Sequence, residues 1–354
     1  MFDLLGTGEP KPAALSGQYA SRFLALAKEV DAPHLREYLS AIVGPRNRFT
    51  AQEKMTQVER YMHKTFEKHG WLVETQNYHH ETFEHWSFER GARVKKQYQN
   101  LKGANVVATK LGEKLDQVVI IGAHYDTVDD SPGADDNGSG IAALLELARV
   151  LGRHNYSKTL VLVAFDMEEI GLVGSIDFVK RVSPKTKVDG AIIFETVGYI
   201  DESENSQKIP PGFSLLYRQQ VGKVKRKQFK GDFITVIHNG KSRKLASLFA
   251  GANQLLNEAV PLVFIRDPLD LPILGPVLKL LFPALTNLLR SDHVPFWQTR
   301  IPAIQLTDTA NFRNPHYHQP TDNIETVNLP VLQRLVQVVA MTVAALAEAR
   351  RESN

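Results

Sequence analysis

The chain of 354 residues is 43% hydrophobic and has a net charge of +3, from 42 basic and 39 acidic residues. This near balance gives no reason to expect nucleic-acid binding, although the isoelectric point is about 8.8. The absence of cysteine from the sequence excludes disulfides and cysteine-peptidase chemistry. The length suits one large α/β domain, so we expect a single domain over residues 1–354.

The N-terminal residues lack the basic region and continuous apolar stretch of a secretory signal. The sequence therefore favours a cytoplasmic protein, with an exported or processed form as the alternative. No continuous apolar run reaches the roughly 18 residues of a membrane span, so we expect no such span.

The predicted elements follow a Gly- and Pro-bearing tail of about 16 residues. Helical patterns cover residues 21–28 and 52–68, and Gly70 suits the end of the second because it lacks a Cβ atom. Further along the chain we expect strands at 71–78, 105–110, 118–122, 160–165 and 191–194, and helices at 141–151 and 329–347. This alternation predicts a three-layer α/β sandwich, with a central, mostly parallel mixed sheet flanked by helices.

The segment 118–140, VVIIGAHYDTVDDSPGADDNGSG, contains the first candidate functional residues. Its apolar start does not alternate with polar residues, as in a strand buried on both faces. His124, Asp126 and Asp136 follow the C-terminal end of this strand. Open α/β sheets bind their ligands at that end.

The same arrangement recurs twice, because Glu168 and Glu169 follow the strand at 160–165 and Glu195 follows the strand at 191–194. A later loop, NPHYHQPTD, adds further histidines. The candidate metal ligands are therefore His124, Asp136, Glu169, Glu195 and His318. Imidazole and carboxylate ligands suit zinc, with manganese and cobalt as weaker candidates. Five ligands are too many for one tetrahedral ion that also holds a water, so two ions sharing a carboxylate fit better.

Each piece also has an ordinary structural interpretation. A single His-x-Asp after a strand is commonly a solvated loop. Asp-Asn-Gly is common in turns and helix caps, and an acidic pair is favoured at a helix N-terminus. Their joint occurrence at successive strand ends is what favours a metal site.

Several motifs between residues 105 and 328 resemble the co-catalytic zinc aminopeptidase family that includes aminopeptidase Y and bacterial leucyl aminopeptidases. These motifs are GAHYDTV, SPGADDNGSG, the pair Glu168-Glu169, FETVGY, SDHVPFW and TDTANFRNPHYHQPTDNIET, in the family's order. Many family members have aspartate at the position of Glu195, whose longer side chain can still bind a metal. The resemblance also implies that the Asp136–Asn137 peptide bond is cis.

The resemblance implies a zinc-exopeptidase-like fold and two zinc ions per chain. His124 and Glu195 would bind one ion and Glu169 and His318 the other, with Asp136 as the bridge. Glu168 would be the general base. Asp126 would orient the imidazole of His124 through its second ring nitrogen, as metal-bound histidines usually require.

These roles predict a metal-dependent aminopeptidase that cleaves the N-terminal bond of peptides with a free N-terminus through a water activated by two zinc ions. Two alternatives belong to other classes: a single-zinc acyltransferase of the glutaminyl-cyclase type, and a binding module that has lost its metals. The retained His124 argues against the first, and the complete ligand set argues against the second. The preferred N-terminal residue, the native metal, the physiological substrate and the oligomeric state do not follow from the sequence.

The segment 201–290 lacks a clear alternation of strands and helices, and we expect an elaboration near the active-site mouth rather than a separate domain. Within it, residues 261–289 are apolar but interrupted by prolines. We expect this stretch to line the substrate pocket through Leu278, Leu281 and Phe282, with packing on the core as the alternative. Asp292 and His293 could support the site, whereas we expect His316 to lie outside it. The cluster of His79, His80 and His85 is interpreted as a solvated strand or loop.

Overall fold

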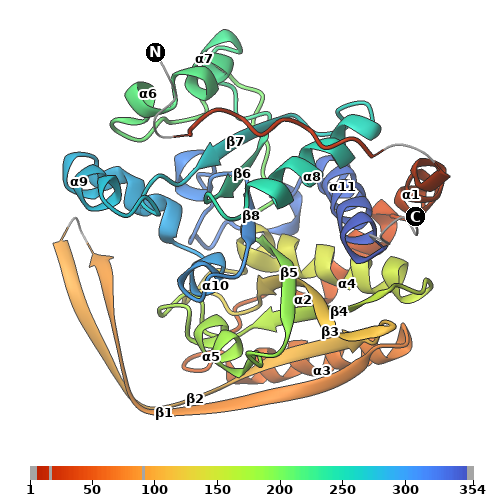
Figure 1. Ribbon diagram of the computed structural model, residues 1–354. Helices are drawn as coiled ribbons and strands as arrows, with labels where there is room; N and C mark the ends of the chain where they lie inside the picture. Colours follow the sequence, from red (N-terminus) through yellow and green to blue (C-terminus); the bar gives the residue numbers. More distant parts are fainter. Residues whose placement is uncertain (1–5, 16–17, 90–91, 349–354) are drawn as a thin grey trace.

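The computed structural model describes residues 6–15, 18–89 and 92–348. These residues form one eight-stranded sheet with the strand order β1-β2-β4-β3-β5-β8-β6-β7 (Figure 1). Strands β3, β4, β5 and β8 form the parallel centre, and antiparallel pairs join β1 to β2, β2 to β4 and β6 to β8. The strands are β1 (Leu72–Glu89), β2 (Ala92–Lys110), β3 (Lys114–His124), β4 (Lys158–Phe165), β5 (Lys187–Phe194), β6 (Ile234–His238), β7 (Leu262–Arg266) and β8 (Ala303–Thr307).

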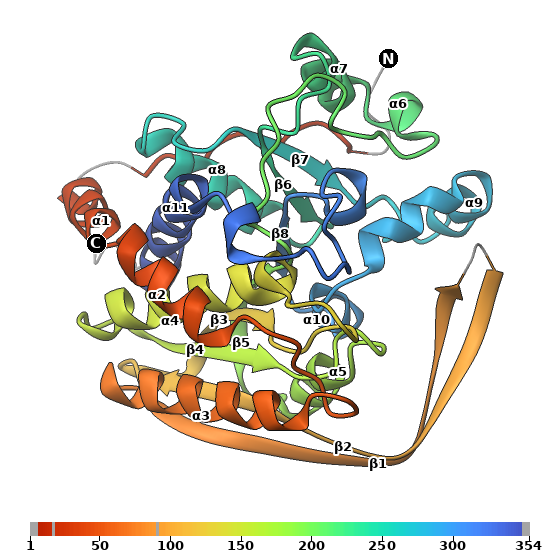
Figure 2. The ribbon, with the colours of Figure 1, turned by 180° about the vertical axis from the view of Figure 1, so that it is seen from behind.

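Helices cover both faces of this sheet (Figures 1 and 2), which confirms the predicted three-layer α/β fold. The larger core contains α1 (Gln18–Lys28), α2 (Ala32–Ile42), α3 (Gln52–Lys68), α4 (Gly140–Gly152), α8 (Arg243–Leu255) and α11 (Leu329–Glu348). The other face is covered by α5 (Val173–Arg181) and α10 (His293–Gln298). Alternate β3 side chains enter these two cores, Val119 and Ile121 on one face and Ile120 on the other. This two-sided burial explains the continuous apolar sequence of β3.

Helix α11 is long and apolar enough to span a membrane, with a mean hydropathy of 1.6 over Leu329–Ala347. The sequence predicted a helix at 329–347 but no membrane span, because polar residues such as Gln333 and Arg334 interrupt the apolar run. In the structure α11 packs against α1, α2, α4 and α8 and against strands β3 and β4. It is therefore a central helix of the larger core.

The strand register brings the candidate ligands to one edge of the sheet. His124 at the end of β3 pairs with Phe165 of β4, and Ala123 pairs with Phe194 of β5. Phe194 in turn pairs with Leu306 of β8. Because these strands are parallel, the loops that follow them start side by side.

The segment 201–290 contributes β6 and β7 to the same sheet, so it contains regular strands that its sequence did not reveal. Both strands are five residues long and are buried along most of their length. Besides α8, which belongs to the larger core, the other elements of the segment are α6 (Phe213–Leu216), α7 (Arg218–Arg226), α9 (Leu274–Leu281) and the 3₁₀ helix η2 (Pro283–Leu289). They form, with β6 and β7, a separate apolar cluster next to the sheet.

Strands β1 and β2 are much longer than predicted and form a hairpin that projects beyond the sheet (Figures 1 and 2). Only residues 106–110 of β2 pair with β4. We call the described residues 78–89 and 92–101 the hairpin arm. Phe83, His85, Lys96 and Tyr98 of the arm are half-buried, whereas Glu84 and Gln97 between them are exposed. This alternation indicates that the arm has one half-buried face here, where Phe83 and Tyr98 pack against a buried cluster that includes Met167.

Candidate metal centre

Asp136 lies between two pairs of candidate ligands. Its Oδ1 atom is 3.3 Å from Nε2 of His124, which is also 3.6 Å from Oε2 of Glu195. Its Oδ2 atom is 3.1 Å from Nε2 of His318, which is 3.1 Å from Oε2 of Glu169. The structure thus brings all five predicted ligands together, with one oxygen of Asp136 directed at each pair.

Several ligand atoms of this cluster lack hydrogen-bond partners in the part of the chain that the structure describes. They include Nε2 of both histidines, both carboxylate oxygens of Asp136 and Oε1 of Glu169. Ligand atoms of His124, Asp136 and Glu169 lie within 4.8 Å of one another. Buried polar atoms left without partners carry a free-energy penalty of about 1–3 kcal/mol each, which a bound cation would remove. The donor set of imidazoles and carboxylates fits zinc.

Local backbone contacts hold Asp136 in this central position. The Asp136–Asn137 peptide bond is cis, as the family resemblance implied. The backbone N–H groups of Asp135 and Asp136 donate to the two carboxylate oxygens of Asp322, at 2.9 and 3.1 Å. The buried guanidinium of Arg46 donates to the carbonyls of Pro132 and Gly133 in the preceding turn. Asp322 and Arg46 therefore fix the loop that carries Asp136.

Asp126 connects the two halves of the cluster. Its Oδ1 atom lies 3.4 Å from Nδ1 of His124, on the side of the ring opposite to Asp136. The same carboxylate accepts the backbone N–H groups of Glu168 and Glu169, at 3.0 and 3.2 Å. This position lets Asp126 orient the imidazole while it fixes the loop that carries Glu169.

Glu168 is buried beside the ligands, with 8% of its surface exposed. Burial, and then the negative charge of Glu195, raise the pKa of Glu168 well above its usual value. Burial and Asp136 similarly raise the pKa of Glu169 to about 7. Several carboxylates thus share a space with only two imidazoles, an arrangement that requires compensating cations or bound protons.

The pKa of His318, in the second ligand pair, is shifted by the same excess of negative charge. Burial alone would lower the pKa of His318, but Glu169 and Asp136 raise it to about 11. The ring of Tyr317 stacks on His318 with the centroids 3.9 Å apart. Tyr317 therefore limits the orientations open to this imidazole.

Sequence reasoning did not single out several residues that support the site. Ser291 donates a 2.7 Å hydrogen bond to Oε2 of Glu195, and Asp322 and Arg46 fix the Asp136 loop. Ser291 and Asp322 lie inside the quoted motifs SDHVPFW and TDTANFRNPHYHQPTDNIET, which were the available signal. Arg46 lies in no such motif, and only the folded chain shows its contacts.

The other candidate residues have separate positions. Asp292 is buried, and this burial raises its pKa to about 7. The charge of His124 opposes this rise, and the charge of Glu195 adds to it. His293 lies apart from the cluster, where its Nε2 contacts the Leu288 carbonyl at 2.9 Å and its ring meets Trp297 edge to face. His316 contacts Thr321 through Nδ1 at 2.9 Å.

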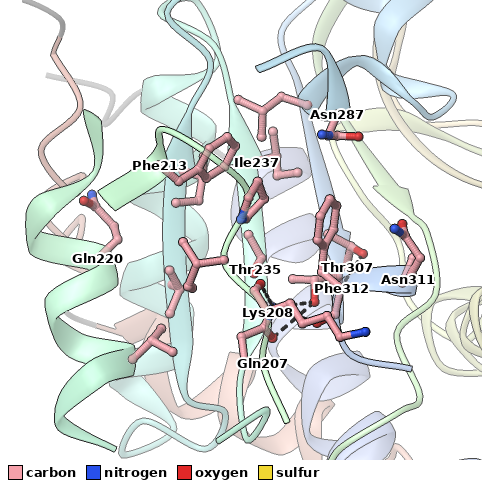
Figure 3. Close-up of a pocket in the computed structure, with 18 of the residues that line it drawn as sticks. Gln207, Lys208, Phe213, Gln220, Thr235, Ile237, Asn287, Thr307, Asn311 and Phe312 are labelled. Carbon is pink, nitrogen blue, oxygen red and sulfur yellow. Dashed lines mark hydrogen bonds between the residues drawn. The ribbon is translucent and has the colours of Figure 1, made fainter. Parts of the chain in front are cut away.

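An apolar cavity of about 890 Å³, its open space included, has Glu195 and Tyr317 among its lining residues. Figure 3 shows this cavity, with Phe213 and Ile237 in its wall. Phe213, Ile237 and Leu288 are among the side chains that line it. The segment 261–289 contributes to its wall through Val263, Ile265, Asn287 and Leu288. The sequence had pointed to Leu278, Leu281 and Phe282, and the lining of this cavity includes none of them. Leu278 and Phe282 instead pack in the cluster behind it, and Leu281 is 64% exposed.

Several relatives align with most of this chain. An uncharacterized protein of Escherichia coli K12, YfbL, is 34% identical over 70% of this chain and 73% of its own length. The aminopeptidase YwaD of Bacillus subtilis is 28% identical over 73% of this chain and 47% of its own length. The chain thus spans about half the length of that aminopeptidase.

Solved structures share the fold at low sequence identity. BSAP, a zinc aminopeptidase from Bacillus subtilis, superposes with a TM-score of 0.64 at 17% identity, over 92% of this chain and 97% of its own. A glutaminyl cyclase from Porphyromonas gingivalis superposes with a TM-score of 0.59 at 18% identity, over 89% of this chain and 98% of its own. The fold alone therefore does not separate these two activities.

The family model of peptidase family M28 matches residues 105–241 and 276–343. These ranges contain all five candidate ligands together with Asp126 and Glu168. The match covers more than half of the chain, and the chain belongs to peptidase family M28.

Proposed function

We propose that this peptidase is an aminopeptidase that holds two zinc ions, bridged by Asp136. His124 and Glu195 would hold one ion, and Glu169 and His318 the other. The observation that carries this proposal is the placement of the two Asp136 oxygens, which are 3.3 Å from His124 Nε2 and 3.1 Å from His318 Nε2. The aminopeptidase names of the B. subtilis relative and of the fold neighbour support the same activity.

Zinc held by these residues would polarise a substrate carbonyl and would lower the pKa of the attacking water towards about 7. The carboxylate of Glu168 takes a proton from the attacking water and returns it to the leaving amine. Its buried position beside Glu195 keeps it near the reacting groups while leaving it outside the two ligand pairs. Asp126 holds the His124 ring in place during this cycle.

The apolar cavity would receive the side chain of the N-terminal residue. It opens at Glu195, and Phe213, Ile237 and Leu288 provide an apolar lining. Each buried methylene group contributes about 0.8 kcal/mol to binding, so larger apolar side chains gain more than alanine. We therefore propose leucyl and phenylalanyl peptides as good substrates.

Metal content and product analysis test this function together. The purified protein should contain two zinc ions per chain and release free leucine from Leu-Gly. Asp136→Ala should release both ions because it removes the bridge, whereas Glu195→Ala should release mainly the ion that it shares with His124. One zinc ion per wild-type chain, unchanged after zinc is supplied, would reject the bridged pair. Pyroglutamate formed from a glutaminyl peptide, without release of amino acids, would reject the peptidase activity.

A further inference from the structure

The metal centre lies between two cavities that share no lining residue. The apolar cavity described above meets the centre at Glu195 and Tyr317. A second cavity meets it at Asp126, Glu169 and His318, on the side of the other ligand pair. We call this second cavity the arm groove, because Lys96 and Tyr98 of the hairpin arm line it together with Phe49.

The arm groove is large and continues into further space along the arm. It contains about 1160 Å³ of empty space, its open side included. A third cavity of about 1210 Å³ continues along the arm and shares Arg48, Phe49 and Met167 with the arm groove. The apolar cavity, by contrast, takes most of its apolar wall from one cluster and suits a single side chain.

Phe49 provides an aromatic surface in the arm groove, where this groove meets the third cavity. Its side chain is 53% exposed, and its ring lies 5.8 Å from the ring of Tyr98. The turn around it is fixed, because Asn47 Oδ1 accepts the backbone N–H groups of Phe49 and Thr50 at 2.9 and 2.8 Å. The guanidinium of the intervening Arg48 binds Asp166, Glu59 and Tyr125. A ring held in this way can bind a ligand without first being ordered.

Tyr98 is held by contacts between the arm and the loop that carries Glu168 and Glu169. The ring of His85 stacks on Tyr98 with the centroids 6.1 Å apart. A Cβ atom added at Gly171 would lie 2.9 Å from Cγ of His85, so the arm and this loop are in direct contact. Phe83 and Tyr98 also pack against a buried cluster that includes Met167. The arm therefore keeps a fixed position relative to the catalytic loop.

From this arrangement we propose that the arm groove binds the substrate residues that follow the scissile bond. Phe49 and Tyr98 contact the first side chain after that bond and make the enzyme favour an aromatic or large apolar residue there. They are specificity-determining residues, because a fixed pair of rings offers a further aromatic side chain a stacking surface. The inference rests on the proposed aminopeptidase activity, which places the N-terminal side chain in the apolar cavity and the leaving part of the peptide on the opposite side.

The test compares kcat/KM for leucinamide, Leu-Gly and Leu-Phe. Leucinamide releases only ammonia and places no side chain in the arm groove, so it reports on the metal centre alone. We expect the wild-type enzyme to prefer Leu-Phe over Leu-Gly. Phe49→Ala should lower kcat/KM for Leu-Phe by about 3- to 10-fold relative to leucinamide, as expected for the loss of an aromatic contact. Tyr98→Ala should lower the same ratio.

Trp86→Ala is the matched control, because Trp86 is an aromatic residue of the arm that is 54% exposed and lines neither cavity beside the metal centre. This variant should keep the wild-type ratio of Leu-Phe to leucinamide. The inference is wrong if Phe49→Ala and Tyr98→Ala leave this ratio unchanged, which includes an equal fall in kcat/KM for Leu-Phe and for leucinamide. If the zinc-loaded wild-type enzyme cleaves none of the three substrates, the proposed aminopeptidase activity fails instead.

Discussion

The backbone N–H of Glu168 donates a 3.0 Å hydrogen bond to Oδ1 of Asp126. The same carboxylate oxygen lies 3.4 Å from Nδ1 of His124. One side chain thus ties the imidazole of the first ligand pair to the loop that carries the ligand Glu169 and the proposed base. A displacement of this loop therefore changes the position of the base relative to both ligand pairs.

If Glu168 is the base, its substitution should lower turnover without loss of zinc. Glu168→Gln should retain both zinc ions, because it leaves the five ligands intact, and should lower kcat by about 10²- to 10⁴-fold. Zinc content and leucinamide turnover would be measured on the same preparation. The exposed Glu113 offers the control substitution Glu113→Gln, which should change neither quantity. Loss of zinc from Glu168→Gln with full turnover after zinc is resupplied would make Glu168 a ligand rather than the base.

The apolar cavity predicts a preference for leucyl over alanyl substrates, and a substitution at Ile237 in its lining should alter this preference. Ile237 is 6% exposed and lines the cavity. Ile237→Ala should reduce the ratio of kcat/KM for leucyl to that for alanyl substrates by about 5- to 10-fold, since a leucyl side chain loses more apolar contact. Leu281→Ala, at a position outside the cavity lining, should leave this ratio unchanged. The opposite pattern would place the N-terminal side chain elsewhere.

His293 makes the stability of the fold depend on pH. Burial lowers the pKa of His293 to about 4 in the folded chain, whereas an unfolded chain has a histidine pKa of about 6.5. Neutral His293 therefore makes its full contribution to the free energy of unfolding above pH 6.5. This contribution, at most about 3 kcal/mol, is lost as the pH falls towards 4. Urea unfolding of the wild type and His293→Phe between pH 4 and pH 7 measures this effect. The variant should show a smaller fall in unfolding free energy; parallel curves would contradict the assignment.

The contact between the arm and the catalytic loop can be tested at Gly171. Gly171 has a φ of +122° and an added Cβ would meet His85 at 2.9 Å, whereas Gly70 has a φ of +80° and no atom within 4 Å. Gly171→Ala should lower both the melting temperature and leucinamide turnover, because it displaces the loop that carries Glu169. Gly70→Ala imposes only the backbone cost of about 1–2 kcal/mol and should leave turnover unchanged. Equal turnover in the two variants would show that the contact does not position the loop.

The sequence predicted the candidate ligands that the structure brings together, because each one follows a buried strand or lies in a recognisable motif. The fold class followed from the same buried strands, and helix α3 matches the predicted residues 52–68. The hairpin arm escaped prediction because its exposed outer face and half-buried inner face are both rich in polar residues such as His79 and Lys96. Helix α2 and strands β6 and β7 were also not identified. Contacts such as those of Arg46 and Phe49 depend on segments far apart in the chain, and no local pattern encodes them.

The link between Asp136 and the loop that carries His318 and Asp322 also has a consequence during synthesis. Asp322 binds the backbone of Asp135 and Asp136, and His318 completes the second ligand pair. A nascent chain that has emerged only as far as β8 lacks both residues, although every strand of the sheet has already been made. Because the ribosome releases the chain from its N-terminal end, the candidate metal centre cannot be complete before residue 322 has emerged. We therefore expect no hydrolytic activity from a nascent chain that ends at β8.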